Sequence, residues 1–153
     1  MSGDVTFGAA RREELPSIIA MFADDELGKA REDTSLPLNA VYTDAFDELD
    51  ARDDVTLLVA RRDGEVIGFA QLFFLRHLSQ KGIRRGQIES VRVRSDMRGH
   101  GIGYAMMEEA LRLFKERGCA MVQLTTDRKR DRTVRFYERL GFEVTHNGMK
   151  LRF

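Results

Sequence analysis

The stretch QIESVRVRSDMRGHGIG, residues 87–103, contains a strand pattern, a glycine-rich turn and the start of a helix. Residues 87–94 alternate between the two faces that a strand presents. Three glycines at alternate positions follow (Gly99–Gly103), and apolar residues then recur at helical spacing as far as Glu116. Glycines at such a turn let the backbone approach a ligand, and the free N–H groups of the helix start attract a pyrophosphate. Plain turn chemistry is the simpler alternative for the same glycines.

The rest of the chain reads as strands and amphipathic helices around this stretch. Asp63-Gly64 marks a tight hairpin turn, and Gly118 and Gly141 mark the C-terminal ends of two helices. The pattern predicts a β-α-α-β-β-β-α-β-α-β-β order within one domain, residues 1–153. We therefore expect an α/β (mixed α+β) fold with a mostly antiparallel twisted sheet of six or seven strands, flanked by about four helices. Its last two strands would be 142–144 and 149–153.

Composition and charge exclude several classes of protein. With 42% hydrophobic residues, 13 glycines and 2 prolines, the chain is neither collagen-like nor proline-rich and disordered. Its apolar runs are shorter than the ~20 residues of a membrane helix, and its first residues lack the pattern of a secretory signal. The lone Cys119 and three histidines without ligand spacing lead us to expect a cytoplasmic protein without a metal. A net charge of zero argues against nucleic-acid binding.

The zero net charge conceals an asymmetry between two parts of the chain. Residues 1–54 contain 14 acidic and 5 basic residues, whereas residues 55–153 contain 11 acidic and 20 basic residues. Ordinary solvated faces account for such a difference. A cleft between a side that welcomes a cation and a side that welcomes a polyanion accounts for it equally well.

The glycine turn fits one anion-binding pattern and not two others. A P-loop needs Gly-Lys-Ser/Thr at its end, and a G-x-G-x-x-G loop would need a glycine at Tyr104 or Met106. The turn does match Arg/Gln-x-x-Gly-x-Gly/Ala, as Arg98-Gly99-His100-Gly101-Ile102-Gly103, and the segment RFYERLGF follows at 135–142. With both motifs in this order, the chain resembles the GNAT acetyl-CoA-dependent N-acetyltransferases over residues 5–153.

The resemblance implies cofactor roles for specific residues. In that family the strand before the loop binds the pantetheine arm of acetyl-CoA through its backbone, a role that falls on Val91, Arg92 and Val93. The pyrophosphate would be wrapped by backbone N–H groups of Arg98, Gly99, His100, Gly101, Ile102, Gly103 and Tyr104. Many members have asparagine seven residues before their catalytic tyrosine. Here that position is Arg130, which suits a phosphate of CoA instead.

Tyr137 and Glu89 are the candidate catalytic residues. The family tyrosine that protonates the departing thiolate falls on Tyr137, and a phenol with a pKa of about 10 suits that role. Regular alternation places Glu89 on the face of Val91 and Val93, where it can accept the proton of an attacking amine directly or through water. Asp127 is a second candidate for that task. The simpler alternatives are a core aromatic at Tyr137 and a surface carboxylate at Glu89.

These observations lead to one expected function and two alternatives. We expect transfer of the acetyl group to a primary amine of a small molecule, by direct attack in a ternary complex. Acetylation of a protein N-terminus or lysine, and a non-catalytic acyl-CoA-binding module, are the alternatives. The acidic residues 1–54 favour a cationic amine, whereas a phosphorylated amine would need basic residues such as Arg84 and Arg85. Met149–Phe153 alternates apolar and basic residues, which predicts an edge strand and a homodimer.

Overall fold

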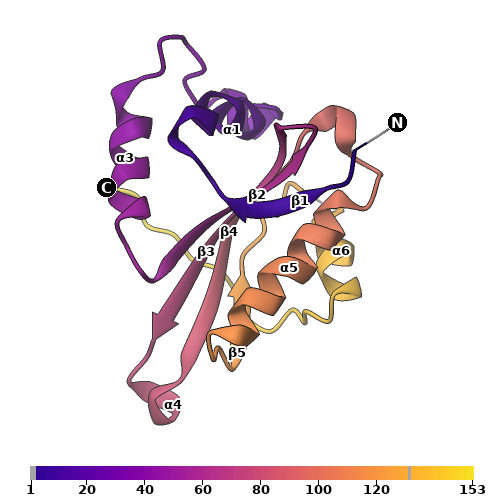
Figure 1. Ribbon diagram of the computed structural model, residues 1–153. Helices are drawn as coiled ribbons and strands as arrows, with labels where there is room; N and C mark the ends of the chain where they lie inside the picture. The colour runs from indigo at the N-terminus through magenta and orange to yellow at the C-terminus, as the bar shows by residue number, and fades with distance from the viewer. Residues whose placement is uncertain (1–2, 131) are drawn as a thin grey trace.

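The computed structural model describes residues 3–130 and 132–153 and contains a five-stranded sheet with helices on both faces (Figure 1). Its strands are β1 (Thr6–Ala9), β2 (Val55–Arg62), β3 (Glu65–Arg76), β4 (Arg84–Val93) and β5 (Met121–Leu124). Its helices are α1 (Leu15–Phe22), α2 (Glu26–Lys29), α3 (Ala40–Asp50), α4 (Ser79–Gly82), α5 (Ile102–Glu116) and α6 (Thr133–Arg139), with short 3-10 turns at Arg12–Glu14 and Ser95–Met97.

The sheet has the order β1-β2-β3-β4-β5 and is mostly antiparallel. Each neighbouring pair from β1 to β4 is antiparallel, and β5 joins β4 in parallel after the α5 crossover. Asp63 and Gly64 both have positive φ between β2 and β3, as the Asp-Gly signal predicts for a two-residue hairpin turn. The expected mixed α/β architecture is confirmed.

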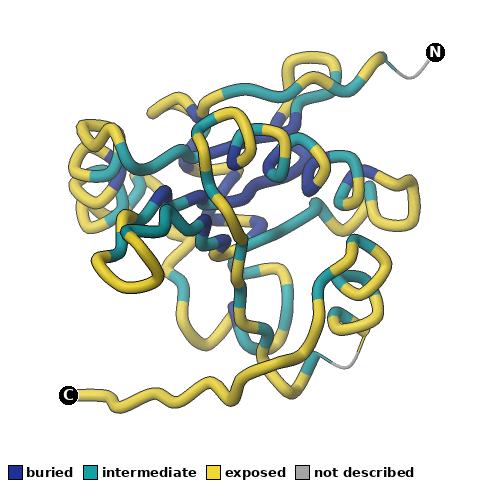
Figure 2. The backbone as a smooth tube through the Cα atoms, turned by 90° about the horizontal axis from the view of Figure 1, so that it is seen from below, coloured by how far each residue is buried: buried dark blue, intermediate teal, exposed yellow. Residues whose placement is uncertain are grey.

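Two apolar clusters hold the helices against opposite faces of the sheet. The spacing of Met106, Ala110 and Phe114 on α5 presents a continuous stripe that is fully buried against one face. On the other face, α1 and α3 bury Ile18 and Phe46 in a second cluster. Figure 2 shows the buried positions of the chain gathered in the middle of the molecule. The sheet therefore has an α5 face and an α1 face.

The strand and helix counts expected from the sequence need correction. The expected strands at 142–144 and 149–153 are not strands among the described residues, and the sheet has five strands instead of six or seven. Residues 143–153, the C-terminal arm, run extended away from the body of the molecule and are exposed throughout (Figure 2). Strand pairing needs backbone hydrogen bonds, and none joins the arm to another segment of the described chain. The two additional helices, α2 and α4, are four residues long.

Gly86→Ala is expected to destabilise the fold by about 1–3 kcal/mol. A Cβ at Gly86 would lie 2.5 Å from the ring of Phe114, which is fully buried and has no room to retreat. Urea unfolding measures the loss. Gly8→Ala is the matched strand control, because its Cβ would meet only the end of the Arg61 side chain, at 3.1 Å. Equal stability of the two variants would contradict this view of the packing.

Candidate active site

The sheet opens between β4 and β5. Their parallel pairing ends at Ile88 and Leu124, and β4 continues alone beyond that point along this edge. A bulge in β4 at Ser90, with φ 56°, lies where the opening begins. A bulge adds a residue, bends its strand and increases the local twist, so the two strands part here. The backbone of residues 89–93 is thereby exposed along one edge.

The open edge of β4 presents carbonyl groups to the gap. The Arg94 N–H donates to Ile67 of β3, so the carbonyl of Val93 points away from β3, and the carbonyl of Val91 points the same way. The Val91 carbonyl accepts a hydrogen bond from the Arg92 Nη1 at 2.9 Å, and the Val93 carbonyl accepts one from the Arg98 Nε at 3.3 Å. Side chains of the protein thus satisfy acceptors that an extended ligand, such as the expected pantetheine arm, could use in their place.

The bulge also changes which side chains share a face. Val91 and Val93 join Ile88 in the cluster on the α5 face. Glu89 lies opposite Gln71 and Arg92 opposite Phe69, a residue of the cluster on the α1 face. The expectation that Glu89 shares a face with Val91 and Val93 is therefore wrong, because regular alternation does not hold across a bulge. Glu89 shares the α1 face with Arg92.

The glycine-rich turn forms a cradle at the N-terminus of α5. Gly99 and Gly101 have φ of 80° and 75°, and a Cβ at either would point into open space. Among the described residues, the N–H groups of 99–104 have no backbone acceptor. The His100 ring turns back to the carbonyls of Met97 and Arg98, at 3.2 and 3.0 Å, so His100 offers only its backbone to the cradle. Free N–H groups and the dipole of a 15-residue helix make this cradle suitable for a pyrophosphate.

Tyr137 is held in place by the end of its own helix. Gly141 takes a positive φ, its N–H donates to Glu138, and the N–H of Phe142 donates to the Tyr137 carbonyl at 3.1 Å. This is the hydrogen-bond pattern of a Schellman motif, as the sequence predicts. The rings of Phe136 and Phe142 meet Tyr137 edge-on, with centroids at 5.1 and 5.7 Å. Burial raises the pKa of the Tyr137 phenol, so the hydroxyl keeps its proton at neutral pH.

The two candidate bases have different surroundings. Glu89 is exposed at the edge of the opening, where its Oε1 accepts a hydrogen bond from the Gln87 amide at 3.0 Å. Asp127 accepts the backbone N–H of Lys129 at 2.9 Å, and this bond lowers the pKa of its carboxyl group. A lowered pKa makes Asp127 a weaker base. Of the two, Glu89 remains the better candidate to accept a proton.

A family model for the acetyltransferase (GNAT) family matches residues 19–142. The chain belongs to this family. A glucosamine 6-phosphate N-acetyltransferase from Trypanosoma brucei brucei is 32% identical over 88 residues, 58% of each chain. An L-methionine sulfoximine/L-methionine sulfone acetyltransferase from Pseudomonas aeruginosa is 26% identical over 133 residues, 86% of this chain and 76% of the relative. The chain spans less than two thirds of the length of the first curated relatives that it matches.

A solved structure has the same fold. A crystal structure described as a transcriptional regulator from Bacillus halodurans C-125 is 41% identical, with a TM-score of 0.95, and the match covers 98% of this chain and 100% of that one. None of the helices in the described residues is long and apolar enough to cross a membrane.

Three ion pairs tie this GNAT chain together across the opening. Residues 24–31, between α1 and α3, contact both of its sides. Asp24 pairs with Arg98 beyond β4, at 3.6 Å. Beyond β5, Asp25 pairs with Arg130 at 2.7 Å and Arg31 with Asp127 at 3.7 Å. Sequence spacing gave no sign of these pairs, because each joins residues from distant parts of the chain.

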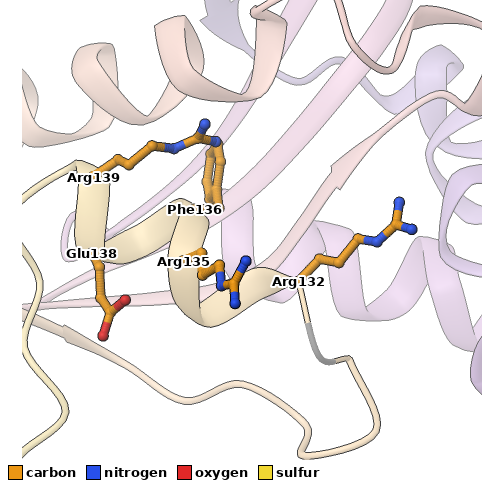
Figure 3. A pocket seen from close by; sticks show the side chains of 5 residues that line it. All are labelled: Arg132, Arg135, Phe136, Glu138 and Arg139. Carbon is orange, nitrogen blue, oxygen red and sulfur yellow. The ribbon is translucent and has the colours of Figure 1, made fainter.

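The sequence analysis did not predict a basic hollow on α6. The hollow, of about 910 Å³, is lined by three arginines, a phenylalanine and a glutamate: Arg132, Arg135, Phe136, Glu138 and Arg139 (Figure 3). A Cβ at Gly103 would lie 3.5 Å from the Phe136 ring, so the hollow adjoins the first turn of α5 and its cradle. The arginine spacing in RTVRFYER, residues 132–139, is the signal that could have revealed it.

Proposed function

We propose that the protein transfers an acetyl group from acetyl-CoA to a primary amine of a small molecule. The observation that carries this proposal is the alignment of three features. The open edge of β4 leads to the glycine cradle on α5. Val93 of β4 and Phe136, next to Tyr137 on α6, both approach Gly103, where a Cβ would lie 3.4 Å from the first and 3.5 Å from the second. An extended thioester with a pyrophosphate at its far end fits this arrangement. When bound, acetyl-CoA would supply an activated acetyl group.

Each group of residues has a defined task in this proposal. The backbone of Val91, Arg92 and Val93 binds the pantetheine arm, and the N–H groups of 99–104 bind the pyrophosphate. The N–H of Arg98, expected to take part, donates to the carbonyl of Ser95 at 3.4 Å instead. The Tyr137 hydroxyl, kept protonated by burial, donates to the thiolate that departs. Glu89 accepts the proton of the amine, directly or through water, as the amine attacks in a ternary complex.

The basic hollow on α6 is the proposed site of a further CoA phosphate. Arg132, Arg135 and Arg139 stand beside the cradle without the carboxylate partner that occupies Arg130. The sequence predicts this role for Arg130. In the structure, however, Arg130 pairs with Asp25 on the α1 side of the opening, and this ion pair competes with the binding of a phosphate. The arginines of α6 have no such competitor among the described residues.

The ion pairs across the opening support a small acceptor. Acetylation of a protein lysine or N-terminus needs a groove open enough to admit a peptide. Here residues 24–31 bridge the loops beyond β4 and β5. The single, partly buried Cys119 fits the reducing cytoplasm that we propose as the setting.

A panel of small amines tests the proposed function. Release of CoA, followed by thiol detection, should occur with acetyl-CoA and at least one small amine, and mass spectrometry should find the acetylated amine. A lysine-containing peptide panel serves as the comparison. Turnover of peptides alone would replace the small amine with a protein acceptor.

A non-catalytic acyl-CoA sensor is the second candidate. It is favoured by the 41% identical structure from Bacillus halodurans, which is described as a transcriptional regulator. Tyr137 and Glu89 at the opening support an enzyme instead. Tight binding of acetyl-CoA without turnover of any amine or peptide would favour the sensor.

We also propose a homodimer in which each C-terminal arm pairs with the other copy. The arm ends in Met149, Leu151 and Phe153, which are exposed apolar residues. β5 is the last strand of the sheet, and its outer edge has no partner among the described residues. An unpaired edge recruits an extended segment through backbone hydrogen bonds, and two mutual exchanges make a closed dimer.

Leu151→Asp is expected to convert the dimer to a monomer. The reason is that the apolar side of the arm would have to bury a carboxylate against the partner. Light scattering at micromolar concentration should give twice 17.5 kDa for the unaltered protein and 17.5 kDa for the variant. Lys150→Glu, on the opposite side of the arm, is the matched control and should stay dimeric. A monomeric unaltered protein would refute the proposal.

A further inference from the structure

We propose that the acceptor amine carries an oxyanion, such as a phosphate, phosphonate or carboxylate, which the guanidinium group of Arg92 binds. This inference rests on the proposed function and specifies its substrate class. It replaces the cationic acceptor expected from the acidic first third of the chain.

Arg92 lies on the side of the sheet that the acceptor would occupy. Its position opposite Phe69 places it on the α1 face, whereas Val91 and Val93 lie on the α5 face, toward the phosphate cradle. Val93, next to Arg92, and Phe136, next to Tyr137, both approach Gly103, where a Cβ would lie 3.4 Å from the first and 3.5 Å from the second. An anion bound by Arg92 would therefore sit beside the proposed reaction centre and not at the cradle.

The charges around Arg92 do not balance. Arg130 pairs with Asp25, and Arg31 pairs with Asp127. Among the described residues no carboxylate forms an ion pair with Arg92, which donates a hydrogen bond from its Nη1 to the carbonyl of Val91. Of these three arginines, Arg92 is therefore the one whose charge is left for a ligand.

Both guanidinium groups also carry buried donors without a partner. The Nε atoms of Arg92 and Arg130 are inaccessible and make no hydrogen bond within the described chain. Burial lowers the pKa of Arg92, and the neighbouring charge of Arg130 lowers it further. Two cations held together in this way are costly unless an anion joins them. A planar guanidinium binds phosphate and carboxylate oxygens through paired N–H donors.

Two acidic residues of the first third that border the opening are already engaged. Asp24 pairs with Arg98, and Asp25 with Arg130. Asp47 on α3 pairs with Arg12. The overall acidity of residues 1–54 therefore does not translate into a free negative surface at the opening.

The test compares matched amines that differ only in the anionic group. O-phosphoethanolamine is paired with ethanolamine, glucosamine 6-phosphate with glucosamine, and β-alanine with propylamine. The expected result is a higher kcat/KM for at least one anionic member of a pair. In Arg92→Met that advantage should fall about 10- to 100-fold, the loss expected when a charged hydrogen-bond partner is removed. Arg92→Lys should restore part of it.

Arg62→Met is the matched control. Arg62 also has a buried Nε without a partner among the described residues, but it lies on β2, which β3 separates from β4. Its removal should leave the anionic advantage intact. Asp25→Asn should strengthen the binding of anionic amines, because it removes the carboxylate that pairs with Arg130. The asparagine can still cap α2. The KM for anionic amines should fall in this variant.

Calorimetry with O-phosphoethanolamine, in the presence of CoA, gives a readout independent of turnover. Binding that Arg92→Met abolishes would support the oxyanion site even if no amine is acetylated, in which case only the proposed function fails. Equal use of both members of every pair, with no change in Arg92→Met, would overturn the oxyanion site and leave the acetyltransferase intact. If Arg92→Met binds CoA more weakly but binds dephospho-CoA as before, Arg92 binds the 3′-phosphate of CoA and not an anion of the acceptor. That result would overturn the proposal.

Discussion

Gly101→Val is expected to abolish detectable binding of CoA. Gly101 caps α5 with φ 75°, a conformation that a β-branched residue adopts only with strain, and its missing side chain leaves the cradle open. A valine there would both distort the turn and fill the space proposed for the pyrophosphate. The measurement is the rise in melting temperature on adding CoA, which follows from selective binding to the folded state.

Gly118→Val is the matched control for this variant. Gly118 ends the same helix with φ 79°, and a Cβ there would also meet nothing within 4 Å. Both substitutions impose similar backbone strain, so both should lower the melting temperature without ligand. Only Gly118→Val should keep the increase caused by CoA. An undiminished increase in Gly101→Val would exclude the cradle as the pyrophosphate site.

Tyr137→Phe is expected to lower kcat by about 10²- to 10⁴-fold while leaving the Kd of CoA nearly unchanged. The phenyl ring would retain the edge-on contacts with Phe136 and Phe142, so the change removes little more than the hydroxyl. Tyr42→Phe, whose hydroxyl bonds to the loop at residues 32–33, is the control for loss of a tyrosine hydroxyl elsewhere. Full activity of Tyr137→Phe would show that water protonates the thiolate.

The pH dependence of kcat follows from the same burial. A raised pKa keeps Tyr137 protonated at pH values above its ordinary 10.0, so the acid stays competent across the range in which amines lose their proton. We expect kcat to rise with pH and to reach a plateau with no descending limb below pH 10. If kcat falls with rising pH below pH 10, and this fall disappears in Tyr137→Phe, the pKa of Tyr137 is not raised as expected.

Features that depend on a few adjacent residues were predictable from the sequence. The hairpin at Asp63-Gly64 and the helix ends at Gly118 and Gly141 require left-handed backbone at glycine or aspartate, and the structure has it there. The cradle is equally local, since its glycines and the following helix are contiguous. These signals were reliable because no distant partner is needed to produce them.

Features that depend on distant partners were not predictable. The strand pattern in Met149–Phe153 is present, but within the described residues this segment joins no sheet. The pair of Arg130 with Asp25 joins residues far apart in the chain. The face on which Glu89 lies followed from the bulge at Ser90, which no side-chain pattern announces.

The bulge at Ser90 shows that two properties of β4 are independent: the faces on which its side chains lie and the bend that parts it from β5. If this one residue were deleted, strict alternation would still leave Glu89 and Arg92 on one face of the sheet and the valines on the other. What would disappear is the bend that parts β4 from β5. The opening between β4 and β5 therefore depends on the number of residues in β4, which contains one more than regular pairing needs. The chemistry at the opening depends on which side chains face it. Evolution can therefore change the opening without changing these side chains, and the side chains without changing the opening.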